Sequence, residues 1–176
     1  MFDILYLFIF IFPAYIANSA PVILGGKFPI DFNKKFFDGR PILGKGKTYL
    51  GLLGGFLAGM LSSILEAKIL IGSEFDIFAS NFYLYLEIGF LLSSGALLGD
   101  LLGSFIKRRL GIKQGKSSFL LDQLTFLVVA LFFVYIAGFR YLFSLENILF
   151  LFFFTYILHR AANYIAFMLK LKKVPW

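Results

Sequence analysis

Five long apolar stretches, separated by polar segments, dominate the pattern of hydrophobic and polar residues along this chain. Each is close to the roughly 20 residues that an α-helix needs to cross the hydrocarbon core of a bilayer. Because such stretches are typical of transmembrane helices, the pattern predicts an all-α integral membrane protein, a single bundle of five transmembrane helices with basic cytoplasmic loops. The predicted spans are about 4–24, 49–71, 82–106, 119–139 and 148–169.

The composition indicates the same class of protein. Hydrophobic residues make up 60% of the chain and charged residues 15%, whereas soluble domains average roughly 45–50% apolar residues. Five spans and their loops use almost all of the 176 residues, so we expect one transmembrane domain over residues 1–176. The chain has no cysteine, which excludes disulfides and thiolate metal sites and leaves carboxylate oxygens as the expected metal ligands.

Basic residues concentrate at alternate ends of the predicted spans. The formal net charge is +7, and Lys and Arg accumulate in the cytoplasmic loops of membrane proteins. We therefore expect a multi-pass protein of the cell membrane with its amino terminus outside and its carboxyl terminus in the cytoplasm. The charge suits anionic headgroups, so we expect membrane lipids as partners and no nucleic acid. The residues that carry this signal are Lys27, Lys34, Lys35, Arg40, Lys45, Lys47, Lys107, Arg108, Arg109, Lys113, Lys116, Lys170, Lys172 and Lys173.

Two of the predicted spans carry glycine at every fourth position. Small residues at this spacing let helices approach closely in a membrane. We expect the two helices that carry these stripes to pack on each other within one molecule, in preference to a dimer interface, and the oligomeric state stays open. The stripes are Gly51, Gly55 and Gly59, and Gly95, Gly99 and Gly103.

Polar residues interrupt the inner end of the third predicted span. Four of them share one helical face, because offsets of four, seven and eight residues return to the same side of a helix. They are Asp100, Ser104, Lys107 and Arg108. A charge inside a membrane costs roughly 2–3 kcal/mol unless it is paired or hydrated. A cation that bridges Asp100 and the later Asp122 would compensate this cost, and it could be the divalent ion of a nucleoside triphosphate. The alternative is a plain salt bridge from Asp100 to Lys107 or Arg108.

The segment between the first two predicted spans, residues 25–47, is rich in glycine, proline and basic residues and is too long for a simple turn. Lys45 and Lys47 lie just before a predicted helix, where backbone amides and positive charge favour phosphate binding. Either lysine could instead serve only as a signal of the cytoplasmic side.

Two further polar features lie inside predicted spans. In the last span, His159, Arg160 and Asn163 either line a site or only hydrogen-bond between helices. Glu87, in the outer half of the third span, is expected to be structural, because polar neighbours or the nearby surface would satisfy its carboxylate.

A group of short motifs resembles the signature of a known family. Gly99-Asp100, then Ser104-Phe105-Ile106-Lys107-Arg108, then Leu121-Asp122-Gln123 is similar to the pattern of the integral-membrane CTP:phosphatidate cytidylyltransferases. In that pattern an acid, an S-x-x-K-R run and a later aspartate surround a metal-nucleotide site. The amino-terminal half resembles the archaeal branch of the family, so that the likeness covers nearly the whole chain. The runs that carry it are Pro13-Ala14-Tyr15-Ile16-Ala17-Asn18-Ser19-Ala20-Pro21, Pro29-Ile30-Asp31-Phe32, Asp38-Gly39-Arg40 and Gly44-Lys45-Gly46-Lys47-Thr48.

The resemblance implies a CTP-dependent nucleotidyltransferase that requires Mg²⁺. It would transfer a cytidylyl group from CTP to the phosphate of a prenylated glycerol ether lipid, 2,3-bis-O-geranylgeranylglycerol 1-phosphate, giving a CDP-lipid and pyrophosphate. Family roles carry over to Asp100 and Asp122 as catalytic metal ligands and to Lys107 as a catalytic charge partner of the phosphates. The resemblance also suggests substrate-binding roles for Asn18, Asp31, Asp38, Arg40, Lys45, Lys47, Ser104 and Arg108.

The chain departs from the bacterial members at the second acid. Thr125 stands where they have a further acid, and Ser117-Ser118-Phe119-Leu120 replaces their histidine-glycine-glycine stretch. This implies a smaller ligand set, completed by backbone, water or substrate oxygens. Two other functions stay open: a small transporter or channel with Asp100 and Asp122 along an ion path, and a related lipid phosphotransferase that uses another nucleotide.

Overall fold

The computed structural model of the chain describes residues 4–116, 118, 121–140 and 144–171. Its helices are α1 (Ile4–Ser19), α2 (Pro21–Leu24), α3 (Tyr49–Leu70), α4 (Phe82–Arg109), α5 (Leu121–Ile136) and α6 (Leu145–Met168). Within these ranges, β-structure is limited to two isolated bridges between α2 and α3. The prediction of an all-α membrane bundle is confirmed. Lys172, Lys173 and the first two residues of the predicted fourth span, 119 and 120, lie outside the described residues.

Four helical segments of the described chain are long and apolar enough to cross a membrane. They are Ile4–Leu24, which joins α1 and α2, and the helices Tyr49–Leu70, Phe82–Arg109 and Leu145–Met168. The remaining helix, α5, has 16 residues and extends about 24 Å at 1.5 Å per residue, short of a hydrocarbon core of roughly 30 Å. The helix at the fourth predicted span, 119–139, is therefore shorter than the sequence pattern predicts.

The first predicted span is two helices rather than one. α1 ends at Ser19 and α2 begins at Pro21, because a proline ring removes one backbone N–H and clashes with the preceding turn. At the start of a helix the missing N–H costs nothing. The break directs α2 against α3, where Pro21 contacts Gly51 and Gly55.

α4 continues to Arg109, beyond the predicted end at residue 106. Lys107, Arg108 and Arg109 therefore belong to the last turn of a helix, where cations interact favourably with the carbonyl end of the helix dipole. Their side chains project from a regular helix rather than from the following loop. α6 likewise begins earlier than predicted, at Leu145, because Ser144 accepts a hydrogen bond from the Asn147 N–H as its N-cap.

The two helices that carry the glycine stripes, α3 and α4, pack on each other as expected, but the two stripes face different neighbours. The α3 stripe lies against α1 and α4: a β-carbon added at Gly55 would come within 2.7 Å of the Ala17 carbonyl oxygen and 2.9 Å of Leu97. The α4 stripe lies against α5, since a β-carbon at Gly99 would come within 2.6 Å of the Phe126 α-carbon. This close approach fixes the beginning of α5 beside the last turns of α4.

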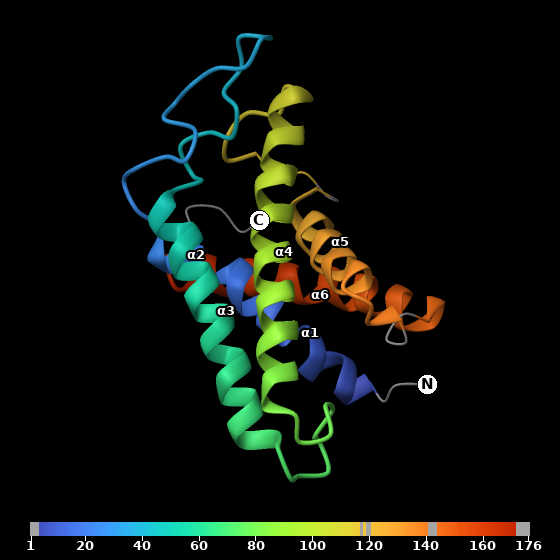
Figure 1. Ribbon diagram of the computed structural model, residues 1–176. Helices are drawn as coiled ribbons and strands as arrows, with labels where there is room; N and C mark the ends of the chain where they lie inside the picture. Colours follow the sequence, from blue (N-terminus) through green and yellow to red (C-terminus); the bar gives the residue numbers. More distant parts are fainter. Residues whose placement is uncertain (1–3, 117, 119–120, 141–143, 172–176) are drawn as a thin grey trace.

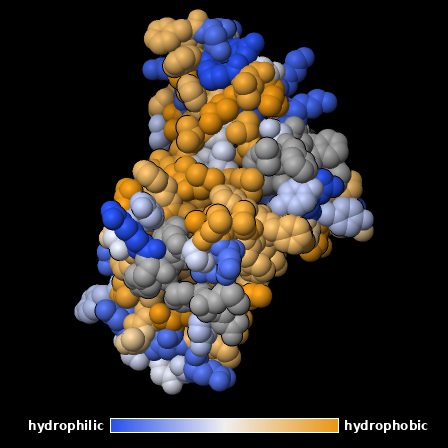
Figure 2. Space-filling view, turned by 90° about the vertical axis from the view of Figure 1, so that its right-hand side faces the viewer, coloured by the Kyte–Doolittle hydropathy of each residue, from blue (hydrophilic) through white to orange (hydrophobic). Residues whose placement is uncertain are grey.

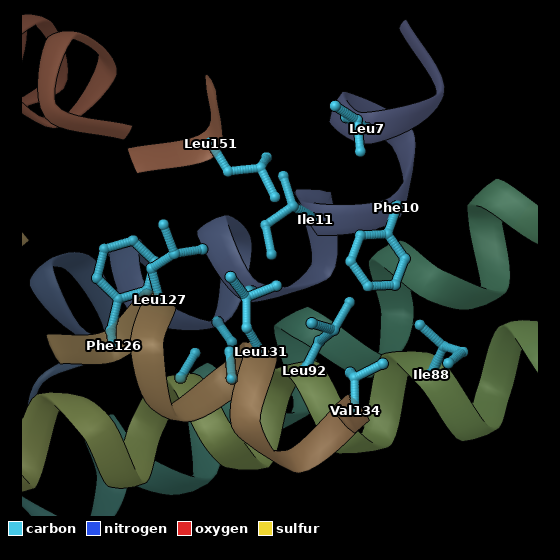
Figure 3. Packing of buried hydrophobic residues seen from close by; sticks show 14 of the residues in the cluster. Leu7, Phe10, Ile11, Ile88, Leu92, Phe126, Leu127, Leu131, Val134 and Leu151 are labelled. Carbon is cyan, nitrogen blue, oxygen red and sulfur yellow. The ribbon is translucent and has the colours of Figure 1, made fainter. Parts of the chain in front are cut away.

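Within the described residues, the apolar core draws on five helices: α1, α3, α4, α5 and α6. Figure 3 shows Ile11 of α1 near Leu131 of α5 and Leu92 of α4, with Leu151 of α6 approaching from the other side. Ile11 and Leu92 are fully buried. α6 contributes Leu151 to this apolar core, and its other buried residues, Asn147 and Thr155, are polar.

Figure 1 shows α3 and α4 upright and side by side, with α5 against α4, and with α1 and α6 crossing behind them. The long connection between α2 and α3 (residues 25–48, the first loop) rises beside the end of α4. We call this the loop end of the molecule and the opposite end, with the turn between α3 and α4, the hairpin end. In Figure 2, hydrophilic side chains lie at the loop end and again at the hairpin end, with large apolar patches between them, as expected where the two ends of a membrane protein meet water.

Candidate functional site

Asp100, the first acid of the predicted site, is paired with Lys47 from the first loop. Lys47 Nζ donates to Asp100 Oδ2 at 2.5 Å, and the two side chains are 26% and 30% exposed. Lys47 comes directly before Thr48, the N-cap of α3. Thr48 Oγ1 accepts from the backbone N–H groups of Gly26 and Gly51, both at 3.1 Å, and so ties the two ends of the first loop together. Lys47 is thereby held at a fixed entry point to the helix.

Asp122, the second acid, is paired with Lys107. Lys107 Nζ donates to Asp122 Oδ1, and the backbone N–H of Ser118 donates to Asp122 Oδ2 at 2.8 Å. Because Asp122 lies in the first turn of α5, the positive end of the helix dipole also stabilises its negative charge. Lys107, an alternative partner of Asp100 on sequence grounds, is thus engaged by the other acid.

The packing of α4 on α5 brings the two acids to the same contact. Gly99, directly before Asp100, lies against Thr125 and Phe126, and Gly103 lies against the Leu121 carbonyl and Thr125. Thr125 Oγ1 donates to the Leu121 carbonyl at 2.7 Å, within its own helix. The position where the bacterial enzymes carry a further acid therefore serves helix packing here.

Ser104 and Arg108, the other two residues of the predicted face, are buried, with 5% and 6% of their surface exposed. Arg108 Nη1 donates to the Ile112 carbonyl and closes the turn after α4. Its Nε has no hydrogen-bond partner within the described part of the chain. Ser104 thus lies inside the helix contacts, and Arg108 organises the end of α4 from within.

Asp31 organises the first loop. Its Oδ2 accepts from the backbone N–H groups of Leu43 and Gly44, both at 2.9 Å, and its Oδ1 accepts from that of Asn33 at 3.0 Å. Burial alone would raise the pKa of Asp31, but these backbone donors outweigh it and hold the pKa below its ordinary value. Asp31 was expected to bind substrate. Its hydrogen bonds instead stabilise the first loop, which carries the two lysines before α3.

Reciprocal arginine contacts attach the outer part of the first loop to the end of α4. Arg109 Nη1 donates to Asp38 Oδ1 at 2.6 Å, and Arg40 Nη1 donates to the Arg109 carbonyl at 2.5 Å. The hydrogen bonds of Asp38 and Arg40 thus go to the end of α4 and to the loop itself. Sequence reasoning treated Arg109 only as part of the cytoplasmic charge, although Phe105, one helical turn earlier, is a signal of an aromatic contact.

Lys45 and Asn18 belong to different elements, the first loop and α1. The backbone N–H of Lys45 donates to Gln114 Oε1 at 3.3 Å, which joins the first loop to the segment after α4, and the Lys45 side chain is exposed. Asn18 follows Ile11 and Ala14 on the buried face of α1, at helical offsets of seven and four residues. No sequence pattern pointed to Gln114, because its contact depends on the fold of the loop.

The polar residues of α6 divide between two faces. The His159 ring stacks on Phe126 of α5, with ring centroids 6.4 Å apart and planes at 29°. His159 and Asn163 continue the buried stripe of Thr155 at four-residue steps and are half-buried, whereas Arg160 is exposed. His159 and Asn163 therefore face the bundle, and Arg160 faces away from it.

An apolar groove opens between α3 and α4 beside the Lys47–Asp100 pair. Its volume is about 440 Å³, and its lining residues are Tyr49, Leu52, Leu53, Phe56, Ser94, Leu97 and Leu98. Leu97 lies about one turn before Asp100 on α4, and Tyr49 lies two positions after Lys47. One end of the groove is thus formed by residues close in sequence to the ion pair, and its apolar lining suits a hydrocarbon chain.

The donor set at the loop end fits a magnesium ion that arrives with phosphates. No group of three or more His, Cys, Asp or Glu side chains suited to a metal occurs in the described ranges. Mg²⁺, however, commonly binds proteins through one or two carboxylates and takes its other ligands from waters and substrate phosphates. Asp100 and Asp122 supply two such carboxylates. In this structure each is paired with a lysine.

Comparison with known proteins relates the whole chain to one family. The family description "CarS-like: CDP-archaeol synthase" matches residues 1–176. A CDP-archaeol synthase of Methanococcus aeolicus is 48% identical, over 96% of this chain and 94% of its own length. One of Pyrococcus horikoshii is 44% identical, over 100% and 99%. A solved structure, reported as "Structural insight into an intramembrane enzyme for archaeal membrane lipids biosynthesis", matches with a TM-score of 0.80 and 38% identity, over 92% of this chain and 94% of that one.

Proposed function

Because this chain belongs to the CDP-archaeol synthase family of nucleotidyltransferases, we propose that it transfers a cytidylyl group from CTP to 2,3-bis-O-geranylgeranylglycerol 1-phosphate. The products are the CDP-lipid and pyrophosphate. One observation carries this proposal: two lysine–carboxylate pairs, Lys47–Asp100 and Lys107–Asp122, lie where an apolar groove reaches the loop end. A lipid phosphate needs charge compensation directly beside a path for its hydrocarbon chains.

The groove between α3 and α4 suits the prenyl chains, because Leu52, Phe56 and Leu98 offer an apolar lining. With a chain in the groove, the lipid phosphate would lie at its polar end, next to Lys47. The burial of prenyl carbons supplies binding free energy of roughly 25 cal/mol per Å² of apolar surface removed from water. Remote binding of this kind orients the reacting phosphate and lowers the entropic part of the barrier.

The lysines of the site compensate the charge of the nucleotide. Lys107 and Lys47 are each placed so that a phosphate oxygen can replace the carboxylate as the partner of the ammonium group. The exposed side chain of Lys45 adds a third cation on the first loop. A bound Mg²⁺, held by Asp100 and Asp122, would supply Lewis-acid polarisation of the nucleotide phosphates.

The reaction needs no covalent intermediate on the protein. The lipid phosphate is already ionised at neutral pH, so one of its oxygens attacks the α-phosphorus of CTP without a general base. As this P–O bond forms, the bond from the α-phosphorus to the oxygen that bridges to the β-phosphate breaks, and pyrophosphate leaves with the electron pair. Lys107 and Lys47 stabilise the negative charge that spreads over these oxygens.

Release of pyrophosphate by the purified protein tests this proposal. The protein is given CTP, Mg²⁺ and the geranylgeranyl ether lipid phosphate. In parallel reactions ATP replaces CTP, phosphatidate replaces the ether lipid, or a chelator removes the metal. We expect product with CTP and the ether lipid, none after chelation and none with Asp100→Asn. Glu74→Gln, an exposed acid at the hairpin end, is the matched control. Turnover with ATP instead of CTP would favour another lipid phosphotransferase, and no chemistry with any nucleotide would refute the proposal.

A further inference from the structure

Arg109, which the proposed reaction does not use, lies over two aromatic rings. Its guanidinium carbon lies 4.7 Å from the centroid of the Phe36 ring and 5.0 Å from that of the Phe105 ring. The two rings also contact each other edge to face, with centroids 5.4 Å apart. A cation held over aromatic faces gains cation–π attraction. Since Phe105 belongs to α4 and Phe36 to the first loop, this stack joins the two segments.

The same guanidinium makes polar contacts on both sides of a tight turn. Nη1 donates to Asp38 Oδ1 at 2.6 Å, and Nη2 donates to the carbonyls of Pro41 and Arg40. Between these groups lies Gly39, whose φ of +74° suits glycine. Arg40 completes the arrangement by donating to the Arg109 carbonyl, which the end of the helix leaves without a helical partner. One planar side chain therefore fixes both arms of the turn on α4.

A short, well-held stretch of backbone leads from this turn to the site. Only residues 42–46 separate Pro41 from Lys47. Within them, Gly44 donates its backbone N–H to Asp31, and Lys45 donates its backbone N–H to Gln114. Because both ends of the stretch are anchored on α4, one at the Arg109 turn and the other at Asp100, a shift at the turn is transmitted to Lys47.

We propose that Arg109 is a positioning residue, which clamps the first loop onto α4 and thereby sets the positions of Lys45 and Lys47 relative to Asp100. Asp38 and Arg40 act within this clamp, so their contribution is to hold the loop rather than to touch substrate. The kinetic consequence rests on the proposed function, since it assumes that the two lysines contact the phosphates of CTP.

Arg109→Lys is the informative substitution. It keeps the positive charge, but an ammonium group cannot reproduce the planar fork that reaches Asp38 and the Pro41 carbonyl while lying over two rings. Lys113→Gln is the matched control, because Lys113 is an exposed basic residue just after α4 and its loss changes the charge of the same end. Asp38→Asn is a second variant that weakens the clamp from the loop side.

The first readout is the mobility of the loop, measured without any substrate. The chain has no cysteine, so Lys35→Cys, at an exposed loop position, accepts a single nitroxide label in the full-length protein in lipid bilayers. We expect a restricted spectrum in the parent and after Lys113→Gln, and a mobile one after Arg109→Lys or Asp38→Asn. A restricted spectrum in both clamp variants would overturn the clamp.

The second readout is steady-state kinetics. We expect Arg109→Lys to raise KM for CTP about tenfold, as for the loss of a charge-assisted bidentate contact, with kcat changed less than KM. The double variant with Asp38→Asn should be no worse than the more impaired single variant, because both act through one contact. Two results for Arg109→Lys would overturn the positioning role. One is an unchanged KM although the label is mobile. The other is a lower kcat with an unchanged KM and a restricted label. If the parent turned over no nucleotide, the proposed function would fail, and the label alone would decide the clamp.

Discussion

At the scale of single residues, the candidate site contains two carboxylates, each paired with a lysine. One lysine is close in sequence to its carboxylate and the other is far from it. Lys107 lies 15 positions before Asp122, whereas Lys47 lies 53 positions before Asp100. The two acids are recognisable as candidates from the sequence, because a charge in an apolar span is costly and therefore rare. The Lys47–Asp100 pair could not, because it depends on how the first loop folds against α4.

Neutral substitution of the Lys107–Asp122 pair tests whether it is functional. Lys107→Gln is expected to lower kcat/KM for CTP by about 100-fold or more, since one lost electrostatic contact to a transition state costs roughly 10²–10³ in rate. The double variant Lys107→Gln/Asp122→Asn also removes the negative charge that the single variant leaves unpaired on Asp122. We nevertheless expect the double variant to stay inactive. Lys116→Gln serves as the control, and recovery of activity in the double variant would reduce the pair to a structural salt bridge.

Because Asp31 is ionisable, we expect the stability of the first loop to depend on pH. Its pKa in the folded protein is below the ordinary value, which is about 3.9. The ionised carboxylate therefore stabilises the fold above that value, and the contribution is lost as the pH falls through the lower folded-state pKa. The difference in Tm between the wild type and Asp31→Asn should stay constant from neutral pH to about pH 5 and shrink below about pH 4. A difference that grows on acidification in thermal melts would contradict this role.

At the scale of helices, length and apolarity predict where each element lies, and local chemistry sets where it begins. Thr48, Asn81 and Ser144 each accept a hydrogen bond at the start of a helix. The partner of each helical face could not be predicted in the same way. A glycine stripe indicates a close approach but not the neighbour, and the α4 stripe meets α5 rather than α3.

The α4–α5 contact gives a test by substitution of glycine. Gly99→Ala would place a carbon within 2.6 Å of the Phe126 α-carbon, and because backbone cannot move aside cheaply, we expect a loss of about 1–3 kcal/mol in the free energy of unfolding. Gly54→Ala is the matched control, since its added carbon meets only the side chain of Leu24. Denaturant titration in detergent measures both. Equal stability of the two variants would contradict the tight packing that brings Asp100 to Asp122.

At the scale of the whole molecule, the distribution of polarity matches a membrane protein whose polar chemistry is gathered at one end. The first loop and the end of α4 bring basic residues from distant parts of the sequence to the loop end, and the start of α5 adds Asp122 (Figure 1). The composition could predict the membrane location, because 60% hydrophobic residues exceed what a soluble domain carries. The orientation follows from the positive-inside rule and stays a prediction.

Cysteine labelling in intact cells tests the orientation. Glu74→Cys at the hairpin end and Lys113→Cys at the loop end are each placed in a chain that has no cysteine of its own. We expect a membrane-impermeant maleimide to label Glu74→Cys from outside and to label Lys113→Cys only after permeabilisation. The reverse pattern would place the site on the side without CTP.

The proposed reaction is tested most directly by following which phosphate of CTP reaches the lipid. The protein in lipid vesicles is given the geranylgeranyl ether lipid phosphate and CTP radiolabelled at either the α-phosphate or the γ-phosphate. We expect the α-label in the lipid product and the γ-label only in pyrophosphate, with both results lost in Asp100→Asn. Transfer of the γ-label to the lipid, or α-label transfer that persists in Asp100→Asn, would contradict cytidylyl transfer at this pair of acids.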